Sequence, residues 1–277
     1  MEATIIPARL VEDAVLTVRP VGAADGWPGP VAFLDGIQRH QVVAYLGTTP
    51  LIIATIAAAV RRRTGRRFRT AEEGWRTLAL GRRELLEAMA PELEGCLPVP
   101  LEDEEESHPI RDTVALRRLI DLERGRLEVA LGCRYREQAD GWLVVDGSLS
   151  ESPELAAAPR TIGVTKSHAA LPFAGEPLER YLTLPAGARS SVFAQVTTRY
   201  AQVYSWGLRL WPWEGKDLLY GLIRVEARPG DDTLAAADEI SRWLLAERAP
   251  VSSPDPRWDR LLYGIRDVET YLKARLR

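Results

Sequence analysis

Two aspartates are each followed by glycine at the end of an apolar run. The first run, "VAFLDG", carries Asp35, and the second, "WLVVDG", carries Asp146. Short apolar runs of this kind predict buried strands, so both carboxylates are expected at strand ends. A glycine at that position lets the backbone turn sharply and leaves room for a bulky substrate. Asp-Gly after a strand is also an ordinary hairpin signal, so either copy alone is compatible with a purely structural role.

A third carboxylate lies on a helix that the spacing of apolar residues predicts over about 112–133. At about 100° per residue, Glu123 falls inside the apolar stripe of this helix and Glu128 falls well outside it. A carboxylate that faces the core is costly unless it is paired or bound to a cation. A salt-bridge partner would also explain it. The stripe itself consists of Leu116, Leu119, Ile120, Leu127 and Leu131.

Asp35, Glu123 and Asp146 could converge on one point of the fold. Converging carboxylates without a local histidine or cysteine cluster are hard oxygen ligands, which suit Mg²⁺ or Mn²⁺ rather than zinc. Two such ions, about 3.5–4 Å apart, would activate a water and stabilise the leaving oxygen of a phosphodiester. The three acids therefore predict metal-dependent phosphodiester hydrolysis.

The elements around these residues are expected to alternate between strands and helices. Three strand-like runs between residues 30 and 60 are joined too closely for helices, which predicts an antiparallel meander. A helix is expected over about 71–90, because Thr70 and "AEE" resemble a capped first turn. An acidic, proline-rich loop follows at 91–110.

The second half of the chain continues the same alternation. Strands are expected over 141–146, in "TIGVTKSH", and in two runs between 191 and 227; two helices are expected near 232–247 and 258–275. This order predicts an α/β fold of the ribonuclease H-like kind, with a mixed sheet flanked by helices. We expect a single elaborated domain over 30–277 after an N-terminal extension at 1–29.

The composition narrows the class of protein. The net charge of −3 gives no global basic field, although "RRRTGRRFR" at 61–69 could follow a phosphate backbone or could be a solvated loop. The longest apolar stretch, at 50–60, is shorter than the roughly 20 residues that cross a bilayer. The first residues lack the pattern of a signal peptide. Two cysteines form no disulfide framework. A cytoplasmic protein is therefore expected.

Ordered blocks along the chain resemble the NurA nuclease family, the partner of the HerA hexameric DNA translocase. They are "FLDG", an acid-bearing helix, "VVDGSLS", "GVTKSH", "LIRVE" and the tail "DPRWDRLLYGIRDVETYLKARL". The resemblance covers about residues 30–275 and is most specific in "VDGSL" followed by "GVTKSH". It implies a ribonuclease H-like nuclease that cuts DNA with Mn²⁺ or Mg²⁺ and acts in DNA end processing.

The resemblance also implies roles for individual residues. Asp35, Glu123 and Asp146 would be the metal-binding carboxylates, with Asp255 as an additional ligand. Glu128 lies closer to Asp146 in sequence and is the alternative helix acid. The substrate-binding candidates are Lys166, His168 and Arg257.

Lys166 would contact the scissile phosphate or stabilise developing charge. It is one of only three lysines among 36 basic residues, and a compact point charge suits that task better than a fork. His168 could donate to a phosphate or ligate a metal, but a lone histidine is more often an ordinary polar contact.

The resemblance and one missing motif together imply partners. The chain has no glycine-rich nucleotide loop, so any ATP hydrolysis must come from another protein, which agrees with a HerA-like hexameric ATPase. The nuclease itself would be a homodimer. Two alternatives remain at this point: a catalytically silent adaptor of the same fold that binds the motor or DNA, and a ribonuclease or phosphodiesterase on the same scaffold.

Overall fold

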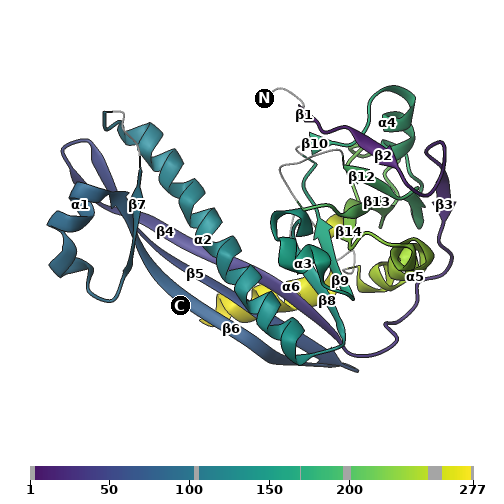
Figure 1. The fold of residues 1–277 in the computed structure, drawn as a ribbon, viewed down its shortest axis with the longest axis horizontal. Coiled ribbons are helices and arrows are strands. Elements are labelled where there is room, and N and C mark those ends of the chain that lie inside the picture. The colour runs from purple at the N-terminus through teal and green to yellow at the C-terminus, as the bar shows by residue number, and fades with distance from the viewer. Residues whose placement is uncertain (1–3, 103–105, 169, 196–200, 249–257, 276–277) are drawn as a thin grey trace. The chain divides into compact units, whose positions relative to one another are not determined.

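The structure, a computed structural model, describes residues 4–102, 106–168, 170–195, 201–248 and 258–275 (Figure 1). Within these residues, no helix carries an apolar stretch long enough to cross a membrane. The chain forms two compact units, which are described separately below. Unit 1 contains residues 1–33, 62–69 and 136–267, and unit 2 contains residues 34–61, 70–135 and 268–277.

In the described residues, twelve strands belong to one mixed sheet. Its order is β2-β12-β13-β14-β9-β8-β4-β5-β6-β7, and in addition β11 pairs with β13 and β3 pairs with β11. Two further short strands, β1 and β10, pair with each other in parallel. Helices flank the sheet. The expected α/β fold, an elaborated domain built on a mixed sheet, is confirmed.

The strands of unit 1 are short. They are β1 (Thr4–Ile5), β2 (Ala8–Leu10), β3 (Val18–Pro20), β8 (Trp142–Asp146), β9 (Thr161–Thr165), β10 (Ala170–Leu171), β11 (Ala188–Ser190), β12 (Phe193–Gln195), β13 (Tyr204–Arg209) and β14 (Leu222–Ala227). The helical elements are η2 (Leu149–Glu151), α3 (Pro153–Ala157), α4 (Gly175–Leu182), α5 (Asp231–Glu247) and η3 (Trp258–Arg260). Strands β8 and β9 are parallel, whereas β14 is antiparallel to both β9 and β13.

Unit 2 is built on long strands. The strands β4 (Val31–Leu46), β5 (Thr49–Thr64) and β6 (Arg67–Arg82) have 16 residues each, and their ends belong to unit 1. The remaining elements are α1 (Arg83–Ala88), η1 (Ala90–Leu93), β7 (Leu97–Leu101), α2 (Pro109–Gln138) and part of α6 (Tyr263–Arg275). Figure 1 shows α2 running along the long strands. The meander expected between residues 30 and 60 has two strands instead of three, because the first two predicted runs form the single strand β4. Its third strand is β6, which lies beyond the predicted range.

The helix expected over 71–90 is wrong for most of its length, because residues 67–82 form β6. Successive glutamates of this strand find partners on different helices. Glu72 pairs with Arg134 of α2 at 3.5 Å, whereas Glu73 accepts a hydrogen bond from Tyr271 of α6. The two faces of β6 therefore both carry polar residues with tertiary partners. Tertiary contacts override the helix-like start of this segment.

A buried ion pair fixes the first turn of α2. Asp112 is almost fully buried, and its carboxylate accepts hydrogen bonds from Arg82 at 2.9 Å and Ser107 at 3.1 Å. The hydrogen bond from Arg82 is the main reason that the pKa of Asp112 lies below its ordinary value. The carboxylate also lies in the first turn of the helix, where negative charge is favourable. The N-terminal turn of the predicted acid-bearing helix is thus fixed by contacts with Arg82 and Ser107.

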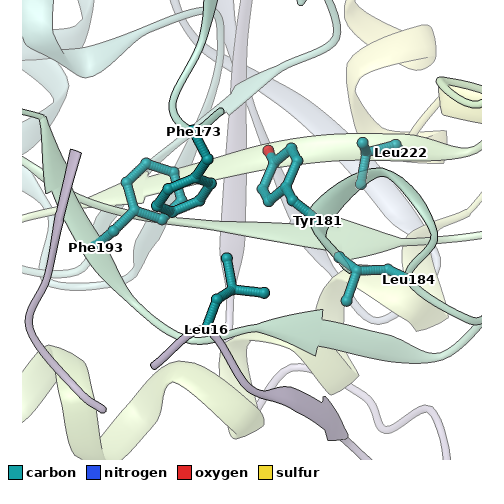
Figure 2. Close-up of a cluster of buried hydrophobic side chains, with 6 residues drawn as sticks. All are labelled: Leu16, Phe173, Tyr181, Leu184, Phe193 and Leu222. Carbon is teal, nitrogen blue, oxygen red and sulfur yellow. The ribbon is translucent and has the colours of Figure 1, made fainter. Parts of the chain in front are cut away.

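An aromatic cluster forms part of the core of unit 1 (Figure 2). Phe173, Tyr181 and Phe193 meet edge to face, with ring centroids 5.1–6.2 Å apart. Tyr181 lies over Gly207 of β13, where a Cβ atom would come within 2.5 Å of the ring. Burial raises the pKa of Tyr181 to about 12. The cluster also contains Leu16, Leu184 and Leu222.

The segment before β4 is tied to unit 1 by a charged network. Arg189, which is 2% exposed, donates to both oxygens of Glu12 at 2.7 and 2.8 Å and to Asp238 at 2.5 Å. Burial alone would raise the pKa of Glu12, but hydrogen bonds from Arg189 and from the Val192 backbone lower it below its ordinary value. Paired in this way, the buried guanidinium is compensated.

Candidate active site

Asp146 and Lys166 lie side by side in unit 1. Asp146 is the last residue of β8, as predicted, and Lys166 directly follows β9. Because the two strands are parallel and Asp146 is opposite Val164, the lysine two residues further on reaches the same face. Its Nζ donates to Oδ2 of Asp146 at 2.8 Å. The Lys166 side chain is 18% exposed and the Asp146 side chain is 23% exposed. An acidic and a basic residue, both partly accessible to solvent, therefore meet at the ends of the two strands.

The chain after Asp146 turns back over β9 instead of continuing the sheet. Gly147 has a φ of 144°, a backbone conformation that residues other than glycine rarely adopt. The turn packs directly on Gly163, where a Cβ atom would lie 2.7 Å from the Gly147 carbonyl oxygen and 2.9 Å from Leu149. The glycines of "VDGSL" and of "TIGVTKSH" therefore serve one close approach of two backbones.

Glu226 of β14 fixes this turn through hydrogen bonds to its side chain. Its carboxylate is fully buried and accepts hydrogen bonds from the Ser148 hydroxyl at 2.7 Å and from the Leu149 N–H at 2.8 Å. The other oxygen accepts from Arg224 at 3.0 Å. Glu226 is opposite Gly163 in the sheet, and this glycine leaves the space that Gly147 and Leu149 of the turn occupy. A buried, fully bonded carboxylate thus fixes the loop that follows Asp146.

The sequence prediction did not include Glu226 among the site residues. The signal that could have found it is the strand "LIRVEA", in which Arg224 and Glu226 are the only charged residues and are two positions apart. Residues at this spacing share one face of a strand. Two opposite charges on one face of an otherwise apolar strand indicate a buried ion pair.

Asp35 belongs to unit 2 and lies inside β4, not at a strand end. The predicted turn at this Asp-Gly pair is therefore wrong. Its side chain is buried, and Oδ1 accepts the Gly36 N–H at 2.8 Å. Gly36 has a different role from the one expected, because a Cβ atom there would collide with the carboxylate of Glu128 on α2. The glycine leaves room for a second acid beside Asp35.

The two helix acids have different surroundings in unit 2. Glu123 is buried, in agreement with its place in the apolar stripe, and it pairs with Arg126 and, at 3.9 Å, with Arg76 of β6. Glu128 pairs with Arg124 and lies against Gly36 of β4. The stripe argument placed Glu123 on the buried face correctly, but the Glu128 side chain, expected well outside the stripe, is almost equally covered, with 12% exposed against 11% for Glu123. The acid next to the Asp35 segment, however, is Glu128.

His168 is hydrogen-bonded to the backbone of unit 1. Its Nε2–H donates to the Leu222 carbonyl oxygen at 3.0 Å. Burial lowers the pKa of His168 below its ordinary value of 6.5, the nearby charges of Arg224, Arg260 and Arg209 act in the same direction, and the hydrogen bond only partly opposes them. The ring is therefore neutral at pH 7. The two other predicted site residues, Asp255 and Arg257, lie outside the described residues.

The oxygen donors are of the right chemical type for a hard divalent cation. Unit 2 supplies Asp35 with Glu128 or Glu123, and unit 1 supplies Asp146. Within the described residues, no group of three or more histidine, cysteine, aspartate or glutamate side chains is close enough to hold a metal ion. The donor chemistry fits, and the meeting of Asp35 with Asp146 stays a prediction.

Comparison with known proteins shows the class of fold. No protein-family model matches the sequence, and no curated protein matches it. The chain is similar in structure to the NurA nuclease from Sulfolobus solfataricus, with a TM-score of 0.51 and 12% identity over 91% of this chain and 86% of that chain. This likeness confirms the expected fold.

Two further structures match with lower TM-scores. Human endonuclease V has a TM-score of 0.37 and 12% identity, over 90% of this chain and 84% of that chain. Endonuclease V from Bacillus subtilis has a TM-score of 0.34 and 12% identity, over 90% of this chain and 81% of that chain.

We predict that Gly163→Ala destabilises the protein by about 1–3 kcal/mol, because the added methyl group meets backbone atoms that cannot rotate away. Chemical unfolding measures this change. Gly125→Ala is the matched control, since a Cβ atom at this position in α2 meets nothing and alanine favours a helix. Equal stability of the two variants would contradict the close packing of the turn on β9.

We also predict a pH-dependent contribution from His168. Because its pKa is lowered by folding, the unfolded chain binds a proton more readily below about pH 6.5. The free energy of unfolding should therefore be unaffected by this group above that pH and should fall as the pH drops below it. Urea unfolding of the wild type and His168→Gln between pH 5 and pH 8 tests this. The difference between them should shift in favour of the variant at low pH, and a constant difference would contradict the prediction.

Proposed function

We propose that the protein is a divalent-metal-dependent DNA nuclease that hydrolyses phosphodiester bonds in DNA end processing. The observation that carries the proposal is the Asp146–Lys166 pair at the ends of two parallel strands, in a fold shared with a NurA nuclease. A carboxylate beside an ammonium group suits a reaction in which a cation and a phosphate must be bound close together.

The proposed metal ligands are Asp35, Asp146 and one acid of α2, with Asp255 as an additional ligand. The contact of Glu128 with Gly36 favours Glu128 as the helix acid, although Glu123 is the one in the stripe. The proposed cofactor is Mn²⁺ or Mg²⁺, with two ions. When bound, these ions would supply a hydroxide-like water at neutral pH and compensate the charge of the leaving oxygen.

The other residues of the site would bind and orient. Lys166 offsets the charge of Asp146 and presents an ammonium group to the phosphate. Glu226 keeps the turn after Asp146 in place through Ser148 and Leu149, so that the aspartate needs no rearrangement during the reaction. His168 is neutral and bonded to a carbonyl, so its proposed contact with substrate would be a hydrogen bond from a neutral ring.

The proposed partners are DNA and a HerA-like hexameric ATPase, and the proposed assembly is a homodimer in the cytoplasm. These proposals rest on the resemblance of the "VDGSL" and "GVTKSH" blocks and on the lack of a glycine-rich nucleotide loop in the sequence. Arg257 would add a contact to the substrate phosphate.

A second candidate is a catalytically silent adaptor of the same fold. It is favoured by one observation, namely that three metal-ligating side chains do not gather within the described residues. An adaptor would bind DNA or the motor without binding Mn²⁺. Calorimetry with Mn²⁺ on the wild-type protein distinguishes the two candidates, because the nuclease must bind the ion and the adaptor does not.

The direct test of the nuclease is DNA cleavage by isosteric variants. Asp35→Asn and Asp146→Asn should each lower the rate with Mn²⁺ on the order of 100-fold or more, because several kcal/mol of charge stabilisation are lost. Glu123→Gln and Glu128→Gln should separate the two helix acids, with the larger loss in Glu128→Gln. Glu176→Gln, at an exposed glutamate of α4, is the control. Undiminished cleavage by either aspartate variant would refute the proposal.

A further prediction concerns Glu226 as a positioning residue. Ser148→Ala removes one hydrogen bond to Glu226 without burying a charge, and it should lower kcat by roughly tenfold through a looser turn. The matched control is Ser241→Ala, which removes a buried hydroxyl bonded to Trp206 and Ala237 away from the turn. Both variants should lose about 1 kcal/mol of stability. If kcat falls equally in both or in neither, Glu226 has only a structural role.

A further inference from the structure

The arginine run at 61–69 folds into the hairpin between β5 and β6. Strand β5 ends at Thr64 and β6 begins at Arg67, with Gly65 in the left-handed conformation at a φ of 61°. In a hairpin, successive side chains point to opposite faces. The hairpin therefore separates the arginines into two groups.

The first group is held by the protein. The guanidinium of Arg63 donates to Glu247 of α5 and lies 5.5 Å from the ring of Phe33 and 5.7 Å from that of Phe68. Arg61 donates to Thr70 at 3.3 Å. These contacts place Arg63 opposite Phe68, and they anchor one face of the hairpin.

The second group points away from that face. The contacts above set Arg62 opposite Arg69, and Arg67 shares their face two residues before Arg69. Arg66 is in the turn. All four side chains are exposed, and within the described part of the chain none of them has an ion-pair or hydrogen-bond partner. No acidic residue occurs between Arg61 and Thr70 in the sequence.

This arrangement has a cost. Like charges directly opposite each other on neighbouring strands destabilise a sheet. An anchored hairpin also cannot move its arginines apart easily. Such a surface binds a polyanion well, because phosphates remove the repulsion and match the forked guanidinium groups.

We propose that the exposed face of this hairpin, formed by Arg62, Arg66, Arg67 and Arg69, binds the phosphate backbone of DNA. The proposal rests on the proposed nuclease function and names the surface that would hold the substrate outside the reacting centre. Binding would be independent of sequence, since backbone contacts carry no base information.

The experiment measures binding of a fluorescent 20-base-pair duplex to the full chain carrying Asp146→Asn, which prevents cleavage. A second protein adds R62Q and R69Q. A third adds R180Q and R228Q instead, which removes the same charge from two exposed arginines of unit 1 that have i,i+4 partners. Titrations between 50 and 300 mM salt give Kd and its salt dependence.

The hairpin variant should raise Kd by roughly tenfold and flatten the slope of log K against log salt by about 1.8, because two phosphate contacts are lost. It should also raise Tm at low salt, and this gain should shrink at high salt as the repulsion is screened. The control variant should change Kd little and should not raise Tm.

Other outcomes would overturn the proposal. Equal Kd and slope in the hairpin variant and the control would show that DNA does not bind this face, while leaving the nuclease proposal intact. Failure of the Asp146→Asn protein to bind DNA at all would refute the proposed function and this inference with it. Hairpin-dependent binding to phosphatidylserine vesicles, without binding to the duplex, would assign the face to a membrane surface.

Discussion

The buried carboxylate of Glu226 is the constraint on which the site in unit 1 depends. It has no exposure to solvent, so each of its oxygens must be satisfied by the protein, and the donors are the turn after β8 and Arg224. This requirement connects three blocks that are far apart in sequence. "VDGSL" supplies the donors, "TIGVT" supplies a glycine that leaves room for the turn, and "LIRVE" supplies the acid. The position of Asp146 follows from that connection.

The periodicity of apolar residues predicts the elements that bury one face. It fails for β6, where both faces carry polar residues that contact other elements. The helix around Glu123 and the strand ending at Asp146 are confirmed because an apolar stripe and an apolar run are strong signals. The sequence predicts a helix where β6 lies, because Glu72 and Glu73 after Thr70 resemble a capped first turn. In the fold, their partners are Arg134 and Tyr271, residues 62 and 198 positions away, which no local pattern contains.

The site was predictable to a similar degree. The pairing of Asp146 with Lys166 follows from two parallel strands, and both residues stood out in the sequence. The reason for Gly36 could not be found in this way, because the carboxylate that needs its space is on a helix more than 90 residues later. Asp-Gly at residue 35 imitates a turn, but the glycine serves a helix–sheet contact. Equal motifs can therefore arise from different physical causes.

The charged network around Arg189 makes the first residues of the chain part of the fold. Strands β2 and β3 complete edges of the sheet, and Glu12 compensates a guanidinium that solvent cannot reach. A variant without residues 1–29 would keep Asp238 as a partner for Arg189 but would lose its bidentate partner, Glu12. The loss of stability would be large, because it leaves a buried charge only partly compensated. The segment expected to be an N-terminal extension is thus an integral part of unit 1.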